Sequence, residues 1–319
     1  MTTYYGLYGQ KVQYLASDPT DVQIGQVWYN STSATLKVRN ATTVGTWASG
    51  GSLNTGRSDV AGAGIQTAAL AFGGYGPTAA TESYDGTSWT TVNSLGTAGY
   101  RLAGAGTQTS AVAIGGFQRT TSTEKWNGTS WTASGSLNTA RTSAAAAGVS
   151  SSSALAFGGD TSTSVATESF NGTSWTTVNS LNTGRRNLAG CGTQTTALGF
   201  GGYTTSPSSA TESWNGTSWT NMTSMGTARY GLSGAGTQTL AIAIGGGPTS
   251  PPFTGATELY NGTSWATSPA TLTTGRTYLG SVGTQTAAVS FGGYNGTRLS
   301  STEEWTGPGT AQTKTVTVT

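Results

Sequence analysis

The sequence predicts an all-β fold made of six copies of one four-stranded unit, and three observations lead to this prediction. Paired glycines follow a short apolar run six times, at residues 73–74, 115–116, 158–159, 201–202, 245–246 and 292–293. A Thr-Glu pair and an aromatic residue follow each glycine pair, the aromatic being Tyr84, Trp126, Phe170, Trp214, Tyr260 or Trp305. Five copies continue with a turn and a tryptophan, and these tryptophans (Trp89, Trp131, Trp175, Trp219 and Trp265) lie 42, 44, 44 and 46 residues apart. This period is typical of a β-propeller, here one of six blades.

The fourth copy indicates the strands of one unit. The small residues around Gly190 and Gly192 predict an inner strand, because a strand without bulk fits the crowded centre of a ring. Thr196 to Phe200 predict the second strand, and Ala210 to Trp214 predict the third. Asn215-Gly216 predicts a hairpin with a type I′ turn, whose central positions both need positive φ. The fourth strand then begins at Trp219.

The fourth strand of the last copy comes from the start of the chain in this prediction. Gly45-Thr46-Trp47 resembles a fourth strand but precedes the first copy, and the last copy has no tryptophan after Trp305. The early strand would therefore complete the last blade and leave no edge unpaired.

Both ends of the chain lie outside the repeats. Residues 25–30 and 36–38 predict a β-hairpin, with a turn or linker at residues 18–20 before it. We expect a hairpin segment at residues 1–40, the propeller at 41–312 and a C-terminal strand at 313–319. That last strand could add to the last blade, replace the early strand, or pair with another subunit.

Composition excludes several classes of function. Charged residues make up 8% of the 319-residue chain and the net charge is +2, so a basic nucleic-acid-binding face is not expected. No apolar run is long enough to insert in a membrane, and the N-terminus does not resemble a signal peptide. Cys191 occupies a position that is alanine in other copies, which indicates a small buried residue. The chain has no histidine, the commonest general base and metal ligand, and no cofactor is expected.

The glycine pairs, the aromatic after the third strand and the tryptophan of the fourth strand resemble kelch repeats. The resemblance covers about residues 41–305 and implies a six-bladed kelch-like β-propeller with a short N-terminal β-hairpin extension. Propellers carry many functions, so this resemblance says little about function.

A second resemblance concerns the origin of the chain. Gly25-Gln26-Val27-Trp28-Tyr29-Asn30, followed by a Ser/Thr turn and Leu36-Lys37-Val38, resembles segments of bacteriophage tail-fibre and other virion proteins. The amino-acid sequence of the repeats is also similar to that of propellers encoded by phages of marine bacteria. The resemblance implies that residues 1–40 dock on other virion proteins and that the propeller points outward from the particle. We expect a homo-oligomer on the virion surface whose propeller binds a host carbohydrate or receptor.

The ligand surface is expected where the loops between second and third strands meet the loops that connect successive units. These loops vary in length on a rigid scaffold, which is where binding specificity is usually placed. Candidate ligand-binding residues on this face are Tyr75, Phe117, Tyr203, Phe253, Tyr294, Tyr100, Tyr230, Tyr278, Arg185 and Arg186. The aromatic rings could bind the apolar faces of sugars, or several could instead fold inward and pack over the blades.

The repeated charges favour a structural role. Six of the seven glutamates occupy one repeat position, and five copies carry an arginine at a second position, where the second copy has Gly99. A catalytic pair is needed once, whereas charges in every unit indicate buried ion pairs or backbone contacts. The alternative is a ring of arginines that attracts anionic glycans.

Enzyme functions are not supported by any motif. Galactose-oxidase-type propellers need copper held by histidine and tyrosine, and Asp85-Gly86-Thr87-Ser88-Trp89 resembles the Asp box of sialidases only loosely. The main alternative to host recognition is a capsid or tail decoration or adaptor protein without a ligand. An intracellular kelch-type interaction module is a weaker third possibility, because no recruitment domain is visible.

Overall fold

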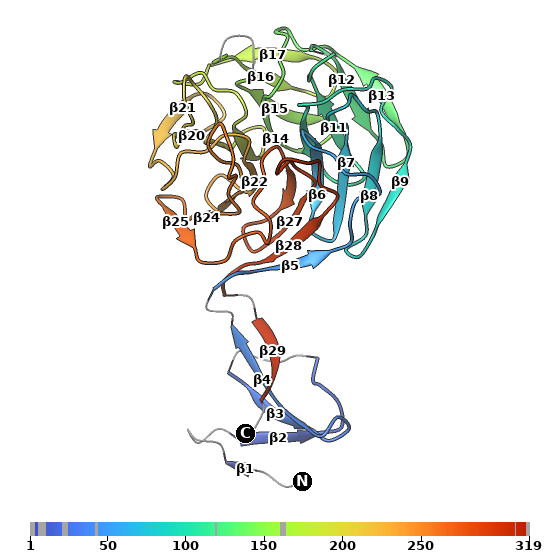
Figure 1. Ribbon diagram of the computed structural model, residues 1–319, viewed down its shortest axis with the longest axis vertical. Coiled ribbons are helices and arrows are strands. Elements are labelled where there is room, and N and C mark those ends of the chain that lie inside the picture. Colours follow the sequence, from blue (N-terminus) through green and yellow to red (C-terminus); the bar gives the residue numbers. More distant parts are fainter. Residues whose placement is uncertain are drawn as a thin grey trace. The chain divides into compact units, whose positions relative to one another are not determined.

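The computed structural model describes residues 4–5, 11–20, 25–41, 44–118, 120–159, 164–309 and 311–316. Strands and turns make up these residues, and the prediction of an all-β protein is confirmed (Figure 1). Within the described ranges, no helix has the length and apolar character needed to cross a membrane. The chain forms two compact units, one of residues 47–305 and one of residues 1–46 together with 306–319.

Residues 47–305 form six four-stranded sheets among the described residues, in a propeller-like arrangement. The first sheet consists of β6 (Ala61–Ile65), β7 (Ala68–Phe72), β8 (Thr81–Tyr84) and β9 (Trp89–Val92). The second consists of β10 (Ala103–Gly106), β11 (Ala111–Ile114), β12 (Thr123–Trp126) and β13 (Trp131–Ser134). The third consists of β14 (Ala145–Ser150), β15 (Ser153–Phe157), β16 (Thr167–Phe170) and β17 (Trp175–Val178). The next two consist of β18 (Ala189–Gly192), β19 (Ala197–Phe200), β20 (Thr211–Trp214) and β21 (Trp219–Met222); and β22 (Ser233–Gly236), β23 (Ala241–Ile244), β24 (Thr257–Tyr260) and β25 (Trp265–Ser268). The sixth consists of β26 (Gly280–Gly283), β27 (Ala287–Phe291), β28 (Thr302–Thr306) and β5 (Thr46–Gly50).

The first strand of each sheet lies near the middle of this unit, and the last lies at its periphery (Figure 1). Successive inner strands contact one another, and β26 also contacts β6. Small residues are needed there: a Cβ added at Gly190 would lie 2.7 Å from the Phe157 ring and 3.0 Å from the Ala146 carbonyl oxygen. The alanine and glycine content of the inner strands therefore sets how closely neighbouring sheets approach.

The hairpin between β20 and β21 shows how the repeated turn is built. Trp214 pairs with Trp219, so four residues form the loop. The Asn215 side-chain oxygen accepts hydrogen bonds from the backbone N–H groups of Thr217 and Ser218, at 2.9 and 2.8 Å. Gly216 has φ of +93°, whereas Asn215 is not in the left-handed region. The predicted type I′ turn is therefore wrong, because asparagine closes this longer loop through its side chain.

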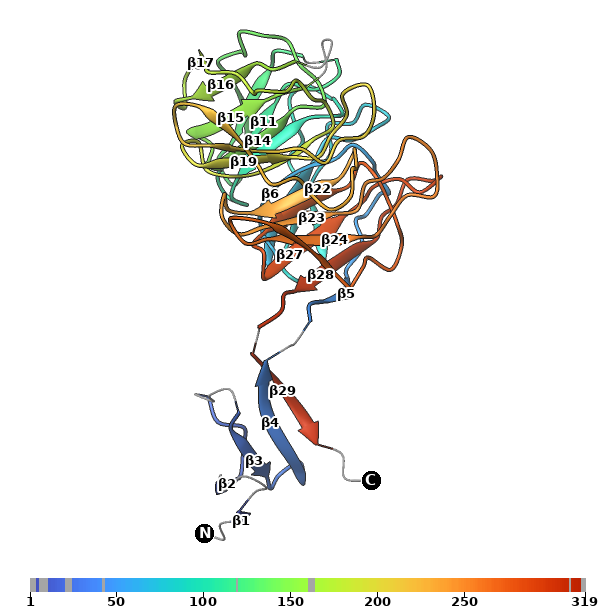
Figure 2. The ribbon, with the colours of Figure 1, turned by 90° about the vertical axis from the view of Figure 1, so that its left-hand side faces the viewer.

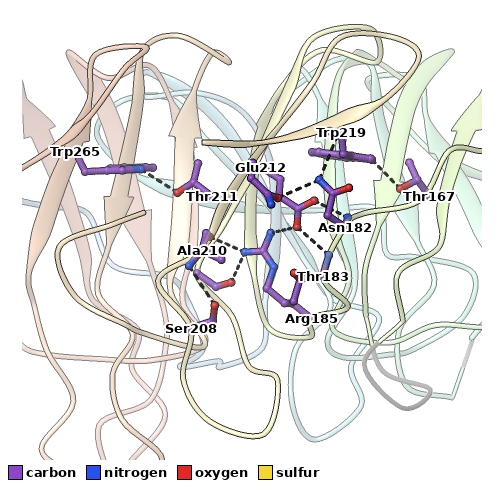
Figure 3. Close-up of polar contacts among 12 residues, drawn as sticks. Thr167, Asn182, Thr183, Arg185, Ser208, Ala210, Thr211, Glu212, Trp219 and Trp265 are labelled. Atoms are coloured by element: carbon purple, nitrogen blue, oxygen red, sulfur yellow. Dashed lines mark hydrogen bonds and ion pairs between the residues drawn. The ribbon is translucent and has the colours of Figure 1, made fainter. Parts of the chain in front are cut away.

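The hydrophobic core lies between sheets. Leu155 and Phe157 of the third sheet pack against Ala197, Trp214 and Trp219 of the fourth sheet. Each outer-strand tryptophan also donates its indole N–H to a threonine hydroxyl of the preceding sheet, as Trp219 does to Thr167 at 3.0 Å (Figure 3). The same bond joins Trp47 to Thr257, Trp89 to Thr302, Trp131 to Thr81, Trp175 to Thr123 and Trp265 to Thr211.

Glutamines of the turns between first and second strands connect the same junctions. The Gln194 amide donates to the Phe170 carbonyl oxygen of the third sheet at 2.5 Å. Gln108, Gln238 and Gln285 make equivalent bonds, and Gln66 donates to the Trp305 carbonyl oxygen at 2.8 Å. The near-constant sequence of these turns thus has a structural cause. The third copy, with Ser150 to Ser153, has a register irregularity in place of the glutamine.

The sixth sheet takes its outer strand from the start of the chain. β5 is the neighbour of β28, as the early Trp47 predicted (Figure 2). The Trp47 and Trp305 rings lie 5.2 Å apart, the contact made in other copies between the aromatic of the third strand and the tryptophan of the fourth.

The other unit contains a five-stranded sheet with the order β1 (Tyr4–Tyr5), β2 (Lys11–Leu15), β3 (Val27–Asn30), β4 (Thr35–Ala41) and β29 (Ala311–Val316). β3 and β4 form the predicted hairpin. Trp28 is fully buried, and its indole N–H donates to the Asp18 carboxylate at 3.0 Å. Asn30 and Lys37 donate to the same carboxylate, so the predicted turn at residues 18–20 anchors the hairpin.

The boundaries of the two units differ from the expected 1–40, 41–312 and 313–319. The division lies after Thr46 and after Trp305, and the C-terminal strand is not separate. β29 pairs antiparallel with β4 over six residue pairs, which is none of the three predicted arrangements. Alternation of threonine and valine predicts a strand but does not identify its partner.

Candidate functional site

The predicted aromatic residues gather on the loops at one end of the propeller-like unit, and three of them form a first group. The Tyr75 and Tyr100 rings lie 5.1 Å apart, and the Tyr100 and Phe117 rings 4.9 Å apart. The backbone positions this group, because Tyr100 and Phe117 form an isolated β-bridge between a connecting loop and a variable loop. Tyr75 and Phe117 are each 46% exposed, so the rings cover one another only partly.

A second group contains Tyr203, Tyr230 and Tyr278. Tyr230 lies 5.8 Å from each of the other two rings, edge to face. Arg101 joins the two groups, because its guanidinium carbon lies 5.8 Å from the Tyr100 ring centre and 5.7 Å from that of Tyr278. Six of the eight predicted aromatics are therefore connected through Arg101, a residue that the prediction did not include.

Two further arginines lie over rings of these groups. Arg298 lies 4.6 Å from the Tyr75 ring centre, and Arg186 lies 4.9 Å from that of Tyr203. Such contacts hold a flexible cation in place while part of it stays hydrated. Phe253 and Tyr294 form a separate pair, 6.2 Å apart, and Tyr294 is 37% exposed. We call the eight aromatics together with Arg101, Arg186 and Arg298 the loop-face cluster.

Arg185 does not belong to this cluster. Its side chain is fully buried, and it pairs with the Glu212 carboxylate at 2.9 Å (Figure 3). The guanidinium also donates to the carbonyl oxygens of Gly201 and Ala210. Burial lowers the pKa of Arg185, and the charge of Glu212 opposes this shift. A ligand cannot reach Arg185 in this arrangement, which corrects its inclusion among the candidate ligand-binding residues.

The predicted structural role of the repeated charges is confirmed in five copies. Arg57, Arg141, Arg185, Arg229 and Arg276 pair with Glu82, Glu168, Glu212, Glu258 and Glu303. The second oxygen of each glutamate accepts a backbone N–H from the segment that connects two sheets, for example that of Asn182 at 2.7 Å. The pair therefore fixes the connecting segment, and the five paired arginines are not a surface ring for anions.

Six residues of the connecting segments surround the centre of the same face, one ahead of the first strand of each sheet. We call Asp59, Arg101, Ser143, Asn187, Gly231 and Tyr278 the axial ring. Each has φ between +50° and +61°. Each member after the first donates its backbone N–H to the carbonyl oxygen of the member before it in the chain, as Tyr278 does to Gly231 at 2.7 Å. Asp59, the first member, donates to Tyr278, the last, at 2.8 Å, so the six bonds form a cycle.

The axial ring surrounds the mouth of a cavity of about 140 Å³, which continues between the inner strands. Arg101 Nε donates to the Asp59 carboxylate at 3.1 Å. Burial raises the pKa of Asp59, and the charges of Arg101 and Arg298 oppose this shift. Burial also raises the pKa of Tyr278, together with its hydrogen bond to Tyr230. The mouth of the cavity is thus lined by donors, acceptors and one aromatic ring.

The sequence contained a signal for the axial ring that the repeat comparison passed over. The axial-ring residue of each copy lies two residues after the position of the repeated arginine, which is Gly99 in the second copy. All six copies carry a different residue at the axial-ring position. Comparison of repeats emphasises what copies share, so a position that differs in every copy is read as free loop. Arg298 was missed for a similar reason, because it lies in a variable loop.

The described residues contain no group of three or more cysteine, aspartate or glutamate side chains that could hold a metal ion. A comparison with models of known protein families finds no family that matches the chain, and a comparison with curated proteins finds no similar sequence.

Proposed function

We propose that this chain is a structural protein of a bacteriophage virion, a tail fibre or tail-associated protein, whose propeller binds a glycan or receptor on the host surface without catalysing a reaction. In this proposal the repeats form a closed six-bladed kelch-like propeller. β5 as the outer strand of the sixth sheet, and the contact of β26 with β6, support the closed arrangement.

The loop-face cluster is the observation that carries the proposal. Aromatic rings offer apolar faces for the C–H groups of a sugar ring, while nearby tyrosine hydroxyls and guanidinium groups can bind its hydroxyls. Tyr75, Phe117 and Tyr294 are exposed, and they are three of the four exposed aromatic side chains among the described residues. Variable loops carry these residues, whereas the repeated turns at the opposite end are occupied with structural hydrogen bonds.

The particle provides the avidity in this account. Residues 1–40 dock the chain on other virion proteins, and several copies assemble so that their loop faces point to the host. A single site with an affinity of roughly 1 mM would then give firm attachment, because simultaneous binding increases avidity by about 10²–10⁴. Neither nucleic acid nor membrane insertion is part of the proposal, in keeping with a net charge of +2.

Binding of the purified chain to an array of bacterial surface glycans tests the proposal. We expect binding to a small set of glycans. Tyr203→Ala should lower the affinity for them at least about tenfold, because this change removes a ring for sugar stacking and the ring over which the Arg186 guanidinium lies. Tyr14→Ala is the matched control, since Tyr14 is 49% exposed but lies in the other unit.

Absence of glycan binding, together with absence of binding to bacterial cells, would contradict the host-recognition proposal. It would favour the alternative of a capsid or tail decoration or adaptor protein. Equal loss in both variants would show that binding does not depend on the loop face.

A further inference from the structure

The axial ring keeps side chains where the backbone favours glycine. A left-handed φ costs a residue other than glycine about 1 kcal/mol or more. Glycine is present in one copy, at Gly231, so the ring accepts it. The other five copies nevertheless carry Asp59, Arg101, Ser143, Asn187 and Tyr278, while the apolar residue that follows each ring position is buried or partly buried as packing requires. Retention of five different side chains despite the backbone strain indicates that these side chains have a use.

The axial ring also contains polar groups that lack a partner. Ser143 is 6% exposed and lines the cavity, and its hydroxyl has no hydrogen-bond partner among the described residues. Leaving a buried hydroxyl unpaired costs about 1–3 kcal/mol. Asn187 lines the same cavity, and its side-chain amide makes no hydrogen bond within the described part of the chain. Arg101 also lines the cavity, and its ion pair with Asp59 is made through Nε, which leaves its terminal nitrogens without a carboxylate partner among the described residues.

The size of the cavity restricts what could complete these groups. An engineered protein cavity of about 150 Å³ accommodates one benzene molecule. A cavity of about 140 Å³ therefore holds the part of a pyranose that enters it, while the remaining substituents of the sugar lie at the open mouth. The lining is polar, which disfavours an apolar ring. A ring that carries several hydroxyls would satisfy Ser143, Asn187 and Arg101 together, and Tyr278 also lines the cavity.

We propose that the axial cavity binds a single pyranose residue at the end of a glycan chain. Ser143 and Asn187 bind its hydroxyls inside the mouth, Arg101 donates to it from the side, and the loop-face cluster contacts the residues that follow. This inference rests on the proposed glycan-binding function and names the part of the glycan that the centre of the face recognises. The fold gives one such site for each chain, although the scaffold is repeated six times.

Ligand-observed saturation-transfer NMR on the full chain tests the inference, with methyl glycosides of glucose, galactose, mannose, rhamnose and N-acetylglucosamine as probes. Asn187→Gly removes the amide and keeps a backbone that Gly231 shows to be compatible with the ring. We expect at least one glycoside to bind, and Asn187→Gly to weaken it about three- to tenfold, the effect of one lost hydrogen bond. Ser143→Gly should weaken the same glycoside.

Gln118→Gly is the matched control, because Gln118 has φ of +70° and is exposed outside the cavity. We expect this variant to bind like the unaltered chain. Asn187→Asp keeps the side-chain shape and the left-handed backbone while it removes the donor, so it replaces Asn187→Gly if that variant does not fold. It should also weaken binding.

The outcomes separate this inference from the proposed function. Glycan binding that Tyr203→Ala abolishes, but that neither Asn187→Gly nor Ser143→Gly changes, would overturn the axial site and leave the proposed function intact. Failure of the unaltered chain to bind any arrayed glycan or cell would overturn both. Equal weakening by Gln118→Gly would also overturn the axial site, because the effect would then come from the backbone.

Discussion

At the scale of single residues, the buried ion pairs determine how the connecting segments are held. Glu212 accepts from Arg185 with one oxygen and from the Asn182 backbone with the other, so it links the guanidinium to the segment between two sheets (Figure 3). Both side chains are almost entirely buried. Removing one partner of the pair is therefore expected to destabilise the fold, because the remaining buried charge has neither a partner nor water around it.

Arg185→Met should lower the free energy of unfolding by about 3–5 kcal/mol, because it leaves the Glu212 carboxylate buried without its partner. The double variant Arg185→Met, Glu212→Leu should recover part of this loss. Chemical denaturation followed by tryptophan fluorescence measures both. Arg186→Met is the control, since Arg186 lies over the Tyr203 ring in the loop-face cluster and is not one of the five arginines of the repeated ion pairs. A loss of the same size there would contradict this explanation.

Asp18 gives a prediction of pH dependence. Hydrogen bonds from Lys37, Asn30 and Trp28 lower its pKa from 3.8 to about 2 in the folded chain. A lowered pKa means that folding favours the carboxylate, so its contribution to stability is present above pH 3.8 and is lost as the pH falls towards 2. The Trp28 indole N–H resonance should shift over this range. In Asp18→Asn the pH-dependent shift should disappear, and its persistence would assign it to another group.

At the scale of elements, the strand that precedes the repeats completes the last sheet. β5 carries Trp47, which packs on Trp305 and donates to the Thr257 hydroxyl at 3.0 Å. Without β5, β28 would become an exposed edge, and exposed edges lead to association of sheets.

Two truncations that differ by six residues test the role of β5. A chain of residues 45–305 keeps β5 and should fold and remain monodisperse. A chain of residues 51–305 lacks β5 and should unfold at a lower temperature and aggregate. Size-exclusion chromatography and thermal unfolding compare the two. Equal behaviour would show that β5 does not stabilise the sixth sheet.

The sequence predicted the elements of the repeats better than the ends or the candidate site. The structural role of the repeated Arg and Glu and the place of β5 were predicted from residues that recur in the copies, because repeated packing needs repeated residues. The Trp-Thr bonds also join recurring residues but were not predicted. The pairing of β29 with β4 was not predictable, because local alternation does not encode a distant partner. The axial ring was missed because its members differ in type, and their shared property is a backbone conformation that arises only on folding.

At the scale of the whole molecule, the repeats form a scaffold whose differences are concentrated at one end. The turns with glutamine and asparagine use their side chains for structural bonds, as Gln194 and Asn215 do. The opposite loops carry the loop-face cluster and the axial ring, and the residue at the axial-ring position differs in all six copies. This asymmetry supports the proposal that the loop end of the repeats binds the ligand.

Immunogold electron microscopy with an antibody to residues 47–305 tests the central claim most directly. The samples are phage particles purified from lysates in which mass spectrometry detects the chain. We predict label at the tail or its fibres, and blocking of attachment to host cells by the same antibody. Label spread over the capsid would contradict host recognition and favour decoration, and particles without any label would contradict the assignment to a virion.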